Sequence, residues 1–165
     1  MLSLRPFEPS DESSLVRYLN NPATVQYLSP KVPFPYTQED ALWWITTGSK
    51  EGITRAIMLD GVLIGCIGAR PGTFEYCRSA EIGYWLAEEY WGQGLTGRAL
   101  QLLVDEVTTT TELMRLEAVV VAQNTRSARV LEKAGFEYEG LRRMAIYKDG
   151  EFFDARLFGK INEHV

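Results

Sequence analysis

A turn that contains three glycines joins an apolar stretch to a run of residues with helical spacing. The apolar stretch covers residues 80 to 87, the glycines are Gly92, Gly94 and Gly97, and the helix is expected over about residues 94 to 107. Glycine allows close approach of the backbone to a ligand, and the first turn of a helix has free N–H groups at the positive end of the helix dipole. The turn is therefore predicted to bind an anion, most often a phosphate group.

Two familiar phosphate motifs fit this turn poorly. A Walker loop needs a Gly-Lys-Ser/Thr sequence, and this turn has no lysine. The spacing of the glycines matches the dinucleotide fingerprint Gly-x-Gly-x-x-Gly, but that motif belongs near the start of a βαβ unit, with an acidic residue after the next strand. Here the turn lies past the middle of the chain, and Gln123-Asn124 follow the next strand. The dinucleotide interpretation is therefore disfavoured.

Composition restricts the classes of site and partner. The 165 residues, 45% of them hydrophobic, suit a single domain over residues 1–165, and no apolar run approaches the ~20 residues of a membrane span. With no signal pattern at the N-terminus, we expect a cytoplasmic protein with no membrane partner. The net charge of −5 argues against nucleic acid. The only histidine is His164, so Ser-His-Asp and multi-histidine metal sites are excluded, and Cys66 and Cys77 suggest neither zinc nor a disulfide.

The hydrophobic pattern predicts alternating strands and helices in the order β-α-α-β-β-β-α-β-α-β-β. Asp60-Gly61 and Asp149-Gly150 are type I′ hairpin turns, Ser10 and Thr37 are expected to cap the first two helices, and Gly135 to end the last. The first helix is expected to end at residues 20–22, the second at Gly48, and the helix after the glycine turn before its run of threonines, residues 108 to 111. The remaining ranges are strands at 2–7, 53–59, 62–69, 80–87, 115–122, 136–147 and 152–158, and a helix at 127–133.

The ordered set of motifs resembles the GNAT superfamily of N-acetyltransferases over nearly the whole chain. The set consists of the strand Ala80-Glu81-Ile82-Gly83-Tyr84-Trp85-Leu86, the glycine turn, and Asn124-Thr125-Arg126-Ser127 continuing to Ala134-Gly135-Phe136. The segments Leu4-Arg5-Pro6-Phe7 and Tyr147-Lys148-Asp149-Gly150 are similar to the RimJ/RimL-like branch, which includes acetyltransferases that act on the N-termini of ribosomal proteins. The resemblance implies an α/β (α+β) fold, with a mixed, mostly antiparallel sheet of about seven strands, splayed at its centre and flanked by about four helices.

The resemblance implies acetyl-CoA as the ligand, with its pyrophosphate on backbone N–H groups of the turn and its pantetheine arm along the open edge of the preceding strand. The residues expected to contact acetyl-CoA are Trp85, Leu86, Ala87, Gly92, Gln93, Gly94, Leu95, Thr96, Gly97, Arg98, Asn124, Ser127, Arg129 and Lys133. Arg98 is the best basic candidate for the phosphates, while Arg129 and Lys133 are equally well explained as solvated helix charges.

The implied reaction is attack of a neutral amine on the thioester. Glu81 is the candidate proton acceptor, directly or through water, although it also suits the exposed face of its strand. The backbone N–H of Leu86 is expected to hold the developing oxyanion, and Ser127 to give a proton to the thiolate. Asn124 is equally well placed as a helix cap. No metal is expected.

This chain departs from the family pattern at several positions. Leu131 stands where many members have a catalytic tyrosine, and Ile146 where some branch members have a glutamate. Trp91 and Thr96 also differ from the usual residues of the superfamily turn. The departures at 131 and 146 leave the general base open and motivate an alternative function, a CoA-binding sensor or partner-binding module without turnover.

The acceptor is the least determined part of the hypothesis. Tyr27, Trp43 and Trp44 fall in the early helical region that flanks the acceptor groove in the family, although aromatic residues at helical spacing are more often core. The acceptor is expected to be a primary amine, either a protein N-terminus or a small molecule. A different acyl donor, such as succinyl-CoA, and a homodimer are further expectations that no motif decides.

Overall fold

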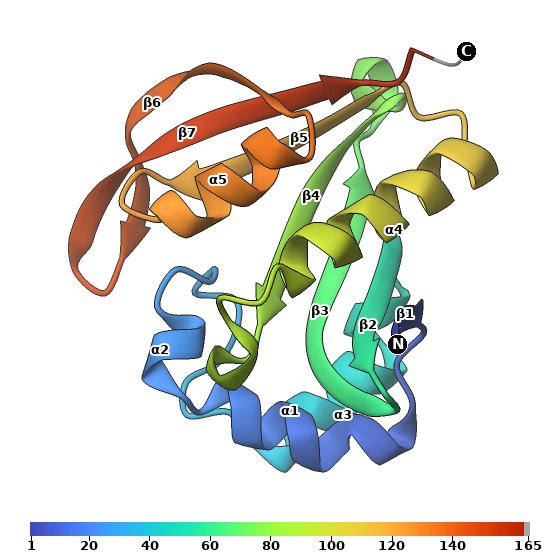
Figure 1. Cartoon of the computed structure of the whole chain (residues 1–165). Helices are drawn as coiled ribbons and strands as arrows, with labels where there is room; N and C mark the ends of the chain where they lie inside the picture. The colour runs from blue at the N-terminus through green and yellow to red at the C-terminus, as the bar shows by residue number, and fades with distance from the viewer. Residues whose placement is uncertain (164–165) are drawn as a thin grey trace.

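The computed structural model describes residues 1–163, so His164 lies outside the described residues. One seven-stranded sheet organises the chain, in the strand order β1-β2-β3-β4-β5-β7-β6 (Figure 1). Among the strands of residues 1–163, only β4 and β5 pair in parallel, and every other neighbouring pair is antiparallel. The strands are β1 (Leu2–Arg5), β2 (Ile53–Leu59), β3 (Val62–Pro71), β4 (Ser79–Leu86), β5 (Arg115–Val121), β6 (Glu137–Lys148) and β7 (Glu151–Ile161).

Helices cover both faces of this sheet and separate two hydrophobic clusters. Residues of α4 and α5 pack on one face, and residues of α1 and α3 pack on the other. The helices are α1 (Glu12–Leu19), α2 (Pro22–Val25), α3 (Gln38–Thr46), α4 (Leu95–Thr110) and α5 (Thr125–Lys133). No helix within residues 1–163 is long and apolar enough to cross a membrane.

Turn and cap chemistry explains why many elements begin and end where the sequence predicts. Asp60 and Gly61 have φ values of 49° and 82°, and Asp149 and Gly150 have 50° and 79°, as a type I′ hairpin requires. Thr37 and Asp40 form a reciprocal capping box at the start of α3. These predictions are confirmed, and the two hairpin turns set the register of β2 with β3 and of β6 with β7 beside them.

The two central strands separate after a short pairing. Ser79, Ala80 and Glu81 of β4 pair with Arg115, Leu116 and Glu117 of β5, and no later residue of β4 pairs with β5 within the described chain. Figure 1 shows the two strands diverging toward the end of β4 that carries the glycine turn. The splayed sheet implied by the family resemblance is therefore present, and a gap opens between Ile82–Leu86 and the second half of β5.

Two local predictions were wrong, and one short helix was not predicted. Ser10 does not cap the first helix, because Asp11 precedes α1 and the Asp11 carboxylate is held by the Arg5 guanidinium at 2.8 Å. The helix α4 continues to Thr110, because the hydroxyls of Thr109 and Thr110 bond back to helix carbonyls instead of ending the helix.

The third difference is the one-turn helix α2, a fifth helix that the sequence pattern did not predict. It begins at Pro22 and is capped by the Asn21 side chain, which accepts a hydrogen bond from the Ala23 N–H at 2.9 Å. The proline that was expected only to end the first helix therefore also starts the next one.

Candidate active site

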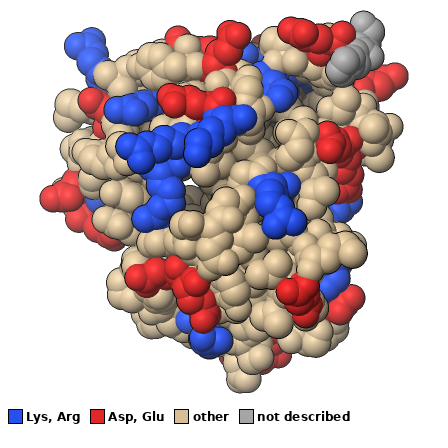
Figure 2. Space-filling model, viewed as in Figure 1, with Lys and Arg blue, Asp and Glu red and all other residues tan. Residues whose placement is uncertain are grey.

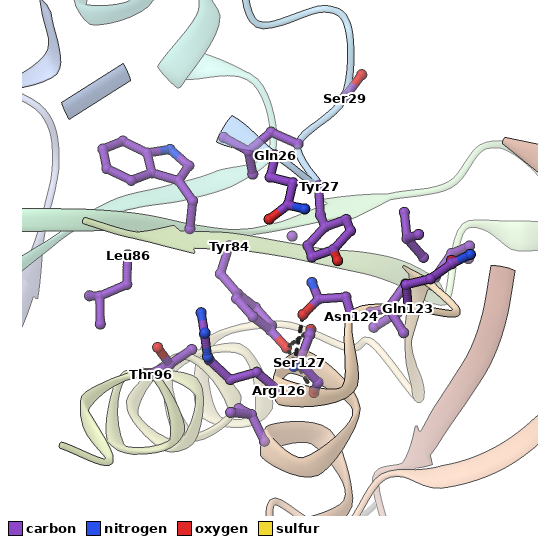
Figure 3. A pocket seen from close by; sticks show the side chains of 18 of the residues that line it. Gln26, Tyr27, Ser29, Tyr84, Leu86, Thr96, Gln123, Asn124, Arg126 and Ser127 are labelled. Atoms are coloured by element: carbon purple, nitrogen blue, oxygen red, sulfur yellow. Dashed lines mark hydrogen bonds between the residues drawn. The ribbon is translucent and has the colours of Figure 1, made fainter. Parts of the chain in front are cut away.

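The gap between β4 and β5 opens into a cleft of about 610 Å³ (Figure 3). Its walls include Ile82–Leu86 of β4, Ala118–Val121 of β5 with the first residues of α5, the α2 region from Ala23 to Pro30, and Ile146, Lys148 and Phe153 of the β6–β7 hairpin. The β4, α2 and β5–α5 segments are far apart in sequence, and the splay of the sheet opens the space between them. Glu81, Trp85, Leu86, Thr96, Asn124, Ser127 and Tyr27 are the predicted site residues that line the cleft.

The edge of β4 presents backbone groups to this cleft. Ala87 donates its N–H to the Ile64 carbonyl of β3 at 2.9 Å. Backbone groups of successive residues in an antiparallel strand point to alternate sides, so those of Leu86 face away from β3 and into the gap. The Leu86 carbonyl accepts the indole N–H of Trp91 at 2.8 Å, which leaves the Leu86 N–H as the donor directed at the cleft. The Ala87 N–H is engaged by β3 and is not available to a ligand in the cleft.

The glycine turn leads from β4 into α4 and suits a bound anion. Gly92 and Gly94 have φ values of 76° and 72°, a left-handed backbone that glycine adopts without strain. The first helical hydrogen bond runs from the Arg98 N–H to the Gly94 carbonyl, so the N–H groups of residues 95 to 97 have no helical acceptor. A Cβ placed at Gly92, Gly94 or Gly97 would meet no protein atom within 4 Å, so the backbone is approachable from outside.

A basic side chain from α5 lies over this region, and sequence reasoning did not select it. The Arg126 guanidinium stacks on the Trp91 ring at 3.8 Å from its centroid, and Figure 3 places Arg126 beside Thr96 at the start of α4. Arg98, the residue favoured by the sequence, is exposed in the first turn of α4. Arg126 and Trp91 are 35 positions apart, so only the fold could show this pair.

A hydrogen-bonded pair of hydroxyls crosses the cleft from β4 to α5. The Tyr84 hydroxyl and the Ser127 Oγ are 2.6 Å apart, and burial raises the pKa of Tyr84 to about 12 although the Ser127 hydrogen bond opposes the shift. Tyr84 is therefore a protonated donor at neutral pH. The side chain of Asn124 accepts the Ser127 N–H at 3.2 Å, so Asn124 is the cap of α5, as one of its two interpretations held. Alternate residues of a strand share a face, so the sequence places Tyr84 on the same face as Ile82 and Leu86 and could have indicated that Tyr84 is part of the site.

Glu81 is the last β4 residue that pairs with β5, and it sits where the two strands begin to separate. It is exposed, its partner in the register is Glu117, and it borders the cleft. Leu131, at the position where many family members carry tyrosine, is fully buried in the core. Ile146 lines the cleft from β6.

The α2 region forms the wall opposite β4, and of the three aromatic residues predicted near the acceptor, Tyr27 lies there. Tyr27 and Gln26 line the cleft and face the strand β4 in Figure 3. Trp43 is 58% exposed on α3, and Trp44 packs edge-on against Phe7 in the cluster under α1 and α3. The structure does not bring Trp43 or Trp44 to the cleft.

Other residues predicted to contact acetyl-CoA lie in the core, against α1, or on the exposed face of α5. Leu95 is buried in the core, and the Trp85 ring packs edge-on near Tyr18 on the face of α1. Arg129 and Lys133 are exposed on α5 outside the cleft lining. Figure 2 shows basic side chains gathered over the part of the molecule where α5 lies, so this helix gives positive charge to an acidic protein.

Comparisons with known proteins agree with this geometry. The family model for the acetyltransferase (GNAT) domain matches residues 1–137. An uncharacterised N-acetyltransferase p20 of Bacillus licheniformis is 32% identical over 163 residues, which cover 95% of this chain and 90% of that protein. The ribosomal-protein-serine acetyltransferase of Escherichia coli is 34% identical over 84 residues, 51% of this chain and 47% of that protein.

The likeness extends to solved structures. The structure of RimL, a ribosomal L7/L12 α-N-protein acetyltransferase in complex with coenzyme A, superimposes with a TM-score of 0.86 at 23% identity, covering 97% of this chain and 93% of that one. A GNAT-family acetyltransferase from Bacillus anthracis gives a TM-score of 0.84 at 26% identity, covering 97% and 94%. The chain therefore belongs to the GNAT acetyltransferase family and is an acetyl-CoA-dependent N-acetyltransferase.

Proposed function

We propose that this protein transfers the acetyl group of acetyl-CoA to a primary amine, either a protein N-terminus or a small molecule, by direct attack of the amine on the thioester. The observation that carries the proposal is the cleft itself, which joins a glycine turn suited to phosphates, an open strand edge and a buried hydroxyl pair. One domain, residues 1–165, performs the reaction in the cytoplasm.

The residues present fit acetyl-CoA. The N–H groups at residues 95 to 97 and the positive end of α4 suit the pyrophosphate, since they have no helical acceptor and their backbone is approachable. Arg126 lies beside them and supplies a cation. The splay leaves Ile82 to Leu86 without a partner strand on the β5 side, and this open edge suits the amide groups of the pantetheine arm.

In this proposal the acetyl transfer takes place at the middle of the cleft, where residues of this chain stabilise the oxyanion and move the protons. The Leu86 N–H donates to the thioester oxygen, where negative charge develops during attack. Glu81, or a water next to it, accepts the proton that the amine loses. The Ser127 hydroxyl donates a proton to the departing sulfur, and Tyr84 donates to Ser127 in turn.

The acceptor is proposed to enter from the α2 side, past Gln26 and Tyr27. Several relatives carry the names of ribosomal-protein acetyltransferases, which supports a protein N-terminus as the first acceptor to test. A homodimer is part of the same proposal, and measuring the mass in solution tests it.

The alternative, a CoA sensor without turnover, rests on Leu131 and Ile146. The Tyr84–Ser127 pair weighs against it, because it places a protonated donor in the cleft although the tyrosine at position 131 is absent. Succinyl-CoA and other acyl-CoA donors are compared with acetyl-CoA in the same assay.

The experiment is free-thiol release from acetyl-CoA in the presence of pooled small amines and pooled N-terminal peptides, with mass spectrometry of the acceptors. We expect thiol release that depends on one pool, together with an acceptor heavier by one acetyl group. CoA binding with no thiol release in any pool would favour the sensor and contradict the transferase.

A further inference from the structure

The segment from Asn21 to Leu28, which contains α2, crosses the acceptor side of the cleft and is tied down at both ends. At its first end, the Asn21 Nδ2 donates to the Glu88 carboxylate at 2.8 Å, and the Glu88 N–H donates to the Thr24 Oγ1 at 3.2 Å. Glu88 begins the short 3₁₀ helix η4 (Glu88–Tyr90), which directly follows β4. This end of the segment is therefore joined to the β4 half of the split sheet.

The other end is joined to the opposite half by one side chain, Lys148. Its Nζ donates to the carbonyls of Val25, Gln26 and Leu28 at 2.7, 2.9 and 2.7 Å. Lys148 is the last residue of β6, in the hairpin with β7, and β7 pairs along the whole of β5. The contact thus spans more than 100 positions of sequence and closes the loop of contacts around the cleft.

The three acceptors account for all three donors of a lysine ammonium. Partial burial lowers the pKa of Lys148, and the nearby Asp149 opposes that shift. The arrangement therefore carries a desolvation cost, and the three partners that offset it are neutral carbonyls. A neutral amine has only two N–H donors, so the protonated form is the one that holds all three carbonyls.

Local structure explains what the ammonium does for its partners. A helix of four residues is not stable by itself, and its last carbonyls have no helical donor. Lys148 donates to the Gln26 carbonyl and adds a second donor to the Val25 carbonyl, which also accepts the Leu28 N–H at 3.0 Å, and it places a positive charge at the negative end of the helix. The same segment carries Gln26 and Tyr27, which face the cleft in Figure 3.

We propose that Lys148 is the positioning residue of the acceptor wall: by holding the Val25, Gln26 and Leu28 carbonyls it fixes Gln26 and Tyr27 and sets which amines enter. The inference rests on the proposed function, because it assigns the α2 side of the cleft to the acceptor. Lys148 touches the wall and not the phosphate end of the cleft, so acetyl-CoA binding does not depend on it.

The test compares Lys148→Met with Lys160→Met. Lys160 is a matched control, because its Nζ also donates to a backbone carbonyl after a helix, that of Ala134 at 2.6 Å, away from the cleft. Lys148→Met is expected to speed amide hydrogen exchange in residues 22–29 and to raise the KM for the amine about five-fold or more, because only the fraction of molecules with an ordered wall binds it. The KM for acetyl-CoA is expected to stay within about two-fold, and Lys160→Met to change neither property.

A second variant separates the ammonium from general damage to the fold. Lys148→Cys is made with Cys77→Ser, because Cys77 is exposed whereas Cys66 is buried, and bromoethylamine then converts the new thiol into a lysine-like amine. We expect this treatment to restore slow hydrogen exchange and the lower KM for the amine.

Three results would overturn the proposal. The first is unchanged exchange over residues 22–29 in Lys148→Met, and the second is an equal rise of both KM values. The third is failure of the restored amine to recover exchange and KM. Hydrogen exchange needs no substrate, so this part of the test holds even if the wild type transfers no acetyl group, a result that would contradict the proposed function alone.

Discussion

At the residue scale, the pair of Tyr84 and Ser127 is the proposed source of a proton for the leaving sulfur in a chain that has leucine at position 131. Leu131 is buried among core residues, where a tyrosine hydroxyl would need a partner. Tyr84 reaches Ser127 from the other side of the cleft, at 2.6 Å. In the proposed mechanism, Ser127 on α5 gives the proton to the sulfur, and Tyr84 on β4 donates to Ser127.

Ser127→Ala and Tyr84→Phe are each expected to lower kcat roughly ten- to hundred-fold, with little change in the KM for acetyl-CoA, because Ser127 is the proposed proton donor to the sulfur and Tyr84 donates to Ser127. The kcat of the double variant should be no lower than that of the less active single variant, since both residues act through one hydrogen bond. Steady-state kinetics check this, with the exposed Tyr76→Phe as control. Additive losses would contradict a shared role.

Arg126→Met is expected to weaken acetyl-CoA binding about ten-fold, the usual size for loss of a hydrogen bond to a charged group. S-Acetylpantetheine, which lacks the phosphates at the α4 end, should bind both proteins equally. Arg129→Met is the control, since Arg129 is exposed on the same helix outside the cleft lining. Equal losses for both ligands would mean that Arg126 does not contact phosphate.

At the scale of elements, two glycines of the turn have different explanations, one from the backbone conformation and one from the proposed ligand. Gly94 has a left-handed backbone and precedes α4, so its φ of 72° explains the glycine by itself. Gly97 lies inside the first turn of α4 and needs no such backbone, which points to the ligand as the reason for glycine.

Gly97→Ala is therefore expected to raise the free energy of unfolding by about 0.5–1 kcal/mol, because alanine favours a helix, and to weaken CoA binding about ten-fold, because a methyl group intrudes on the phosphate. Thermal unfolding and titration calorimetry measure the two effects. Gly140→Ala in β6 is the control, since its Cβ also meets no protein atom within 4 Å. A variant that is more stable and binds CoA normally would place the phosphate elsewhere.

The elements that could be predicted from the sequence are those whose ends depend on local chemistry. The hairpins at Asp60-Gly61 and Asp149-Gly150 and the cap at Thr37 need only neighbours in the sequence, and all three are present. The α2 segment depends on a distant partner, because Lys148 holds its carbonyls from more than 100 positions away, although the local Asn21-Pro22 pair could have indicated where the helix starts. The members of the Tyr84–Ser127 and Trp91–Arg126 pairs are likewise distant in the sequence, so no local pattern could show these pairs.

At the scale of the whole molecule, burial keeps three tyrosine hydroxyls and one cysteine thiol neutral to higher pH than in the unfolded chain. Burial raises the pKa of Tyr18, Tyr36 and Tyr84 from 10.0 to about 12, and that of Cys66 from 9.0 to about 12. In each case the folded state keeps a proton that the unfolded chain loses at lower pH.

The stability that these groups contribute is therefore complete below about pH 9 and is lost as the pH rises through about 12. We expect the Tm to be nearly constant from neutral pH to about pH 9 and then to fall steadily. Calorimetry across this range, with Tyr36→Phe to flatten part of the fall, checks the assignment. A Tm that does not change between about pH 9 and pH 12 would contradict it.

The central claim is that the glycine turn and the open edge of β4 form one site for the phosphates and pantetheine arm of acetyl-CoA. Calorimetric titration of the wild-type protein with CoA and with pantetheine tests it most directly. The account predicts one CoA per chain and binding of pantetheine weaker by about 10²-fold, because pantetheine lacks every group that the turn and Arg126 hold. Equal affinity for the two ligands, or no binding of CoA, would contradict it.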